Sequence, residues 1–103
     1  MPTRILALFN LRPGVGIAAY EQWAKTVDLP TVNALPSVDN FEVFRVTGKL
    51  GSDEPAPYAY AEIIDVADME GFGRDIATPK IQEVAASFGT MADVVFLNTE
   101  KLD

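Results

Sequence analysis

Residues 20–38 bring a carboxylate next to two large aromatic side chains. Apolar and aromatic residues recur there with the i, i+3, i+4 and i+7 spacing of one helix face: Tyr20, Trp23, Ala24 and Val27. Asp28 follows at the border between this face and solvent, and Pro30 favours a helix end before it. A partly desolvated Asp28 has a raised pKa and can act as general acid or base near neutral pH. In the other interpretation it is an exposed carboxylate that only ends a surface helix.

A second group of polar side chains lies on two predicted strands, residues 41–47 and 58–66. Pairing these strands as a hairpin sets Arg45 opposite Tyr60 and diagonal to Glu62. Such a cluster can orient a substrate carbonyl or hydroxyl, and Glu62 is a second candidate for proton transfer. It can equally be a structural ion pair, and a register slip of one residue would separate its members.

Three further side chains are candidate ligand contacts. Tyr20 and Trp23 either pack in the core or offer stacking surfaces to a flat heteroaromatic ligand. The second role needs a gap in the sheet beneath them, which small residues such as Ala59 and Ala61, or Ala7, can leave. Asn10 ends the first predicted strand, where its amide either contacts a ligand or completes a turn.

The composition excludes several kinds of chemistry. The chain has 103 residues and contains neither histidine nor cysteine, so thiolate chemistry and the commonest general base are absent. We therefore expect no metal and no cofactor. A net charge of -7 argues against binding to nucleic acid or to anionic membranes. The sequence shows no apolar run of membrane-spanning length and no signal peptide, so we expect a cytoplasmic protein.

The hydrophobic periodicity predicts an α+β fold in a single domain, residues 1–103. Four strands are expected, at residues 4–11, 41–47, 58–66 and 93–98. Helices are expected at residues 16–27, 29–35, 68–76 and 78–89, the last ending at Gly89. The β-α-β-β-α-β order predicts a ferredoxin-like fold, in which a four-stranded antiparallel sheet carries its helices on one face.

Both faces of the predicted strands carry apolar side chains, although helices can cover only one of them. A large exposed apolar face marks an interaction site. We therefore predict a homodimer in which two sheets pack face to face, burying on the order of 2,000 Å² or more.

The sequence resembles the dimeric α/β-barrel superfamily, which includes EthD-type proteins. The resemblance lies in RPG at residues 12–14, DLPTVNALPSV at 28–38 and YAYAEIIDV at 58–66. Asp28 stands where EthD-type sequences have a histidine, so an EthD-type role does not carry over to it. Over its whole length the chain is similar to the RedY-like, HapK-type proteins of prodiginine pigment biosynthesis. This resemblance implies a dimeric barrel in a pathway for aromatic or pyrrolic natural products.

Two functions agree with these features. One is a cofactor-independent enzyme that binds a flat pyrrole- or indole-like intermediate and catalyses a dehydration, isomerisation or cyclisation. Asp28 or Glu62 would move the proton in this enzyme, and Arg45 or a tyrosine would polarise an oxygen. The alternative is a non-catalytic carrier of a reactive intermediate, for which no carboxylate needs a perturbed pKa. A raised pKa on Asp28 or Glu62 favours the enzyme.

Overall fold

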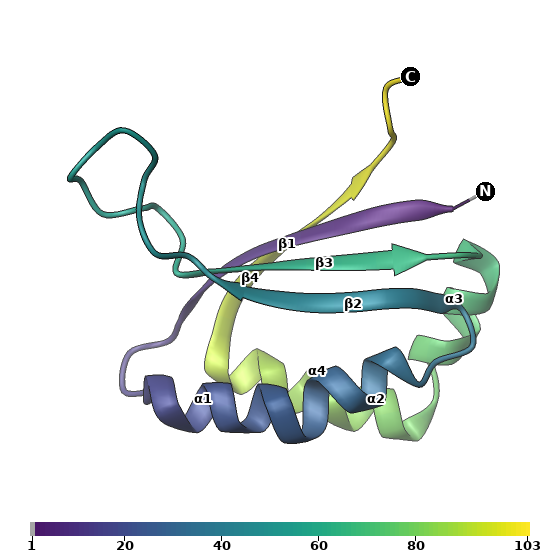
Figure 1. Ribbon diagram of the computed structural model, residues 1–103. Coiled ribbons are helices and arrows are strands. Elements are labelled where there is room, and N and C mark those ends of the chain that lie inside the picture. The colour runs from purple at the N-terminus through teal and green to yellow at the C-terminus, as the bar shows by residue number, and fades with distance from the viewer. Residues whose placement is uncertain (1) are drawn as a thin grey trace.

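The computed structural model describes residues 2–103. Four antiparallel strands form one sheet, and the helices lie against a single face of it (Figure 1). The strands are β1 (Thr3–Leu11), β2 (Val38–Arg45), β3 (Tyr60–Val66) and β4 (Ala92–Thr99). The helical segments are α1 (Ile17–Trp23), the π-helix η1 (Ala24–Asp28), α2 (Leu29–Asn33), α3 (Met69–Ile76) and α4 (Pro79–Met91). The sheet order is β2-β3-β1-β4, which confirms the predicted ferredoxin-like fold. Among residues 2–103, no helix is long and apolar enough to cross a bilayer.

The first helix continues where the sequence predicts a break. Leu29 is α-helical, with a φ of −58° and a ψ of −51°, and its N–H donates to the carbonyl of Ala24 five residues earlier. Pro30 lacks an N–H and, in a regular α-helix, clashes with the carbonyl four residues before it. The wider π turn accommodates this proline. The predicted helix end before Pro30 is therefore wrong, and α1, η1 and α2 form one continuous rod (Figure 1).

The other predicted helices agree better with the structure. Asp68 caps α3 by accepting hydrogen bonds from the backbone N–H groups of Glu70 and Gly71. Helix α4 begins at Pro79, as predicted, but it passes Gly89 and ends at Met91. Gly89 has no positive φ and so does not form the left-handed cap that the sequence suggests. The chain enters β4 directly after α4.

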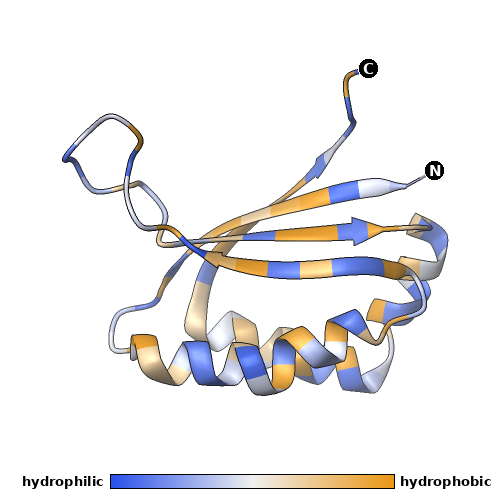
Figure 2. Cartoon of the chain, in the orientation of Figure 1, coloured by the Kyte–Doolittle hydropathy of each residue, from blue (hydrophilic) through white to orange (hydrophobic). Residues whose placement is uncertain are grey.

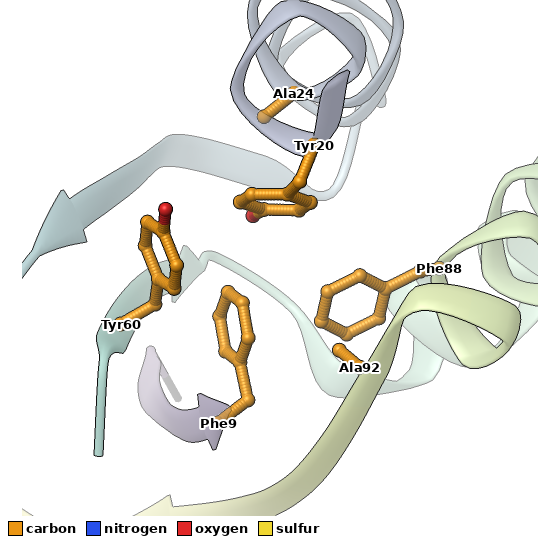
Figure 3. Close-up of a cluster of buried hydrophobic side chains, with 6 residues drawn as sticks. All are labelled: Phe9, Tyr20, Ala24, Tyr60, Phe88 and Ala92. Atoms are coloured by element: carbon orange, nitrogen blue, oxygen red, sulfur yellow. The ribbon is translucent and has the colours of Figure 1, made fainter. Parts of the chain in front are cut away.

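The space between sheet and helices holds two clusters of buried side chains. One is mainly aromatic and is shown in Figure 3: Phe9, Tyr20, Ala24, Tyr60, Phe88 and Ala92. The other is mainly aliphatic: Ile5, Val38, Phe41, Ile64 and Val66. Along β3 the two clusters are separated by a single inward-facing residue, Glu62.

The opposite face of the sheet is apolar as well. Figure 2 shows the hydrophobic stretches along the strands. The strand residues on this outer face include Leu6, Leu8, Phe44, Ile63, Val95 and Leu97. Phe44, Val95 and Leu97 expose 44%, 39% and 43% of their surface, which is unusual for large apolar side chains gathered on one sheet.

Candidate functional site

A cavity of about 300 Å³ lies between the sheet and the helices. The first helical rod contributes Asp28 and Val32, the sheet contributes Phe41 and Glu62, and α3 and α4 close the remaining side. Most of the other lining side chains are apolar or aromatic: Ile5, Leu35, Ile64, Phe72, Ile76, Ile81, Val84, Phe88 and Phe96. The volume is at the lower end of the range for small-molecule sites, and suits a compact, flat ligand.

The π-helix places Asp28 in this cavity. Residues that face the sheet recur at every fourth position of the rod, through Tyr20, Ala24, Asp28 and Val32. An α-helical period, which the sequence suggests, instead selects Val27 for the buried face and leaves Asp28 at the border with solvent. The extra residue in the π turn rotates Asp28 inward. Its exposed fraction is only 6%.

Glu62 reaches the same cavity from the centre of the sheet. It lies between Val43 on β2 and Ala7 on β1, and Ala7 is completely buried. The sequence suggested that Ala7 leaves a gap beneath Tyr20 and Trp23, whereas the structure places it directly beside Glu62 in the sheet. Glu62 is 3% exposed, and its Oε2 atom has no hydrogen-bond partner among residues 2–103. A buried polar atom without a partner is costly and needs a functional or structural reason.

Both carboxyl groups have raised pKa values. Burial raises the pKa of Asp28 to about 6. Burial also raises the pKa of Glu62 to about 8, and the charge of Asp28 adds to this shift. No lysine or arginine lines the cavity within the described part of the chain, so no cation offsets the desolvation. At neutral pH the pair therefore holds one proton, with Glu62 as the acid and Asp28 as the base.

The predicted cluster around Arg45 forms with a different acidic residue. Arg45 lies opposite Tyr60 as predicted, but its guanidinium binds Glu21 of α1 rather than Glu62. The Tyr60 hydroxyl donates to the same Glu21 carboxylate at 2.7 Å. Glu62 pairs with Val43 and so lies diagonal to Arg45, as predicted, but the Arg45 guanidinium is bound to Glu21 instead. Together with Lys25, these residues line a second hollow of about 240 Å³.

Sequence reasoning missed Glu21. It lies next to Tyr20 on α1, at the boundary of the apolar stripe, and such a position usually carries a solvated charge. Only the packing of α1 across the edge of β2 reveals that it meets Arg45 and Tyr60. No sequence signal for this contact is present.

The remaining predicted ligand contacts lie outside the cavity lining. Trp23 stacks on Phe88 with ring centroids 6.3 Å apart, and belongs to the packing around the aromatic cluster. Asn10 donates to the Pro57 carbonyl and accepts from the Ala59 N–H, so it fastens the loop before β3. Tyr20 is fully buried, and its hydroxyl has no hydrogen-bond partner among residues 2–103. No group of three or more acidic side chains suited to a metal ion occurs in this same range.

Comparison with known proteins agrees with this fold. The crystal structure of HapK from Hahella chejuensis is 33% identical, with a TM-score of 0.80 over 99% of this chain and 93% of that one. A dimeric ferredoxin-like protein of unknown function from Thermobifida fusca is 25% identical, with a TM-score of 0.73 over 96% and 90%. SnoaB, a cofactor-independent oxygenase from Streptomyces nogalater, shares the fold at 14% identity, with a TM-score of 0.78 over 99% and 94%. None of the curated proteins compared matches the chain. The family model described as REDY-like protein HapK matches residues 3–102, and the chain belongs to this HapK family.

Proposed function

We propose that this protein is a cofactor-independent acid–base catalyst that acts on a flat aromatic intermediate of a biosynthetic pathway. The observation that carries this proposal is the carboxyl pair Asp28 and Glu62, buried together in an apolar cavity with pKa values of about 6 and 8. General acid–base catalysis is most efficient when catalytic pKa values lie near the working pH. Groups perturbed in this way cluster at functional sites.

The chemistry open to the pair is a proton transfer across a bound ligand. Asp28 removes a proton from the substrate, while the protonated Glu62 donates one or holds a developing negative charge. Dehydration, isomerisation and cyclisation all use this combination of base and acid. A proton transfer of this kind accelerates a reaction by roughly 10²–10⁴-fold.

The substrate we propose is a pyrrole- or indole-like intermediate of a prodiginine-type pathway. The aromatic lining, with Phe41, Phe72, Phe88 and Phe96, suits a flat apolar ring system. Membership of the HapK family supports the pathway. The fold shared with SnoaB, which is named a cofactor-independent oxygenase, supports chemistry without a bound cofactor.

We further propose that the protein works as a homodimer. The apolar outer face of the sheet needs a partner of matching shape, and a second copy supplies one. The relative from Thermobifida fusca is named as dimeric. Light scattering should give a dimer mass for the wild type. Leu8→Arg, placed near the centre of the outer face, should shift it to the monomer, and an unchanged dimer would contradict this interface.

The test of the catalytic proposal is mass spectrometry of pathway extracts incubated with purified protein. Wild type should convert one intermediate, and Asp28→Asn should lose that conversion while its fold and melting temperature are retained. Asp39→Asn is the matched control, because Asp39 is an exposed carboxylate that does not line the cavity. If wild type converts nothing but retains an aromatic metabolite, the protein is a carrier.

A further inference from the structure

Two buried polar atoms of residues 2–103 have no hydrogen-bond partner: the hydroxyl of Tyr20 and Oε2 of Glu62. Tyr20 is 0% exposed and Glu62 is 3% exposed, so solvent reaches neither side chain freely. A buried polar group without a partner destabilises the fold unless a ligand satisfies it. Of the two residues, Glu62 lines the cavity and Tyr20 does not.

Tyr20, Glu62 and Asp28 are brought together by two separate features of the fold. Tyr20 and Asp28 occupy the same face of the helical rod, two turns apart, because the π turn keeps that face in register. Glu62 lies on β3, beneath that face and next to the ring of Tyr60, which packs 5.0 Å from the ring of Tyr20. Asp28 and Glu62 therefore meet in the lining of the cavity, and Tyr20 lies outside that lining.

The protonation states define what these groups can bind. Burial and the charges of Glu62 and Asp28 raise the pKa of Tyr20, so its hydroxyl keeps its proton. Glu62, with its pKa of about 8, is a neutral acid at pH 7 and can donate a hydrogen bond. Asp28 is the charged member and can only accept. A donor beside a base matches an oxygen that gains negative charge when a neighbouring C–H bond is broken.

We propose that Glu62 binds the oxygen of an enolisable carbonyl substrate while Asp28 removes the proton from the adjacent carbon. This inference rests on the proposed function and narrows its substrate class to ketones or related carbonyl compounds with an apolar aromatic body.

The step balances without any further reactant. The C–H bond breaks, and its proton passes to Asp28. The electron pair of that bond forms the C=C bond of the enolate, and the carbonyl π electrons move to the oxygen. The hydroxyl group of the protonated Glu62 stabilises that oxygen. Return of a proton to carbon completes a tautomerisation, and attack of the enolate on a second carbonyl within the same ligand completes a cyclisation.

Two small probes test this class of substrate with the full-length wild-type protein. 2-Naphthol imitates an aromatic enol, and naphthalene has the same ring body without the oxygen. We expect 2-naphthol to bind roughly tenfold more tightly than naphthalene, by fluorescence titration, because it satisfies the orphaned Oε2 of Glu62. We also expect the protein to accelerate exchange of the α-protons of 2-tetralone in deuterated water, measured by NMR.

Four variants assign the effect to the proposed atoms. Glu62→Leu should abolish the preference for 2-naphthol, and Glu62→Gln, which keeps a neutral N–H donor, should retain most of it. Tyr20→Phe, a change outside the cavity lining, should leave it nearly unchanged. Asp28→Asn should keep the preference but lose the proton exchange. Circular dichroism of each variant confirms that the comparison is made on folded protein.

The outcomes separate this inference from the proposed function. Equal binding of 2-naphthol and naphthalene to the wild type would overturn the inference. Tighter binding of 2-naphthylmethylamine than of 2-naphthol would also overturn it, since a cation would then be the preferred occupant. In either case, conversion of a pathway intermediate that depends on Asp28 would leave the proposed acid–base function standing.

Discussion

Two glutamates of this protein, Glu62 and Glu21, show opposite responses to the fold. Glu62 is buried without a hydrogen-bond partner for Oε2, and its pKa rises to about 8. Glu21 binds Arg45 and accepts a hydrogen bond from Tyr60, and these contacts lower its pKa to about 2. One carboxyl group is therefore a neutral acid at pH 7, and the other is a fixed anion. A satisfied carboxylate supports the structure, whereas an unsatisfied one is available for a ligand.

The difference between the cavity and the Arg45 cluster can be tested by removing one carboxyl group from each of them. Asp28→Asn should lower conversion of the pathway intermediate by roughly 10²-fold or more, because it removes the base. Glu21→Gln should change it by only a few-fold, because its carboxylate is committed to Arg45. Initial rates by mass spectrometry measure both, and equal losses would show that the two regions form one site.

The pH dependence of kcat/KM should show which carboxyls take part. The titratable groups around the cavity are Asp28, Glu62 and Tyr20, and Tyr20 keeps its proton throughout this range. Activity should rise about tenfold per pH unit up to pH 6, as Asp28 ionises. It should fall in the same way above pH 8, as Glu62 loses its proton. A profile that is flat between pH 5 and 9 would show that neither group acts in the reaction.

The free energy of unfolding should also depend on pH, because Glu62 binds its proton more tightly in the folded protein than in the unfolded chain. The pKa of Glu62 rises from its ordinary 4.5 to about 8 in the folded protein, so the native state binds more protons between these values. The free energy of unfolding should therefore fall as pH rises from about 4.5 to 8. Glu62→Gln should stabilise the protein at pH 8 by about 1–3 kcal/mol, measured by urea unfolding. The gain should vanish at pH 4, where Glu62 is already neutral in both states.

The smallest effect is expected at the edge of the sheet. Arg45→Ala should lower the melting temperature slightly, because surface ion pairs contribute little and salt screens them. Melting curves at low and high salt measure this, and the difference between variant and wild type should shrink at high salt. A large loss of stability that persists in high salt would indicate that Arg45 is buried in an assembly.

The sequence predicted most of the fold because its signals are local. Alternation along the strands, the cap at Asp68 and the restart at Pro79 each depend on a few neighbouring residues. The pairing of Arg45 with Tyr60 was also predictable, since the loop between β2 and β3 fixes the hairpin register. The end of α4 was missed because Gly89 stays helical, and the choice of that glycine as a stop relied on propensity alone.

The candidate site was only partly predictable. Asp28 and Glu62 stood out as carboxylates in apolar segments, but their common cavity depends on a π turn that no propensity scale indicates. The partner of Arg45 depended on how α1 crosses β2, which is a tertiary relation between residues 24 positions apart. The helical spacing predicted that Trp23 lies on the apolar face of the helix. The spacing cannot tell whether such a side chain faces a cavity or stacks on a neighbouring ring, as Trp23 does on Phe88.

The π turn between Ala24 and Asp28 also has a genetic consequence. It contains one residue more than an α-helical turn would need, so deleting a single codon in this segment would restore regular α-helix without touching the sheet. Each residue of an α-helix advances the face by about 100°. The shortened helix would place the carboxylate seven residues after Tyr20, which is again the same face, so both side chains would still point inward. It would lose the wide turn before Pro30, and the proline ring would then clash with a carbonyl of the preceding turn. A one-codon insertion that is absorbed as a π turn can therefore admit a proline into an ordinary helix without turning its buried face away from the sheet.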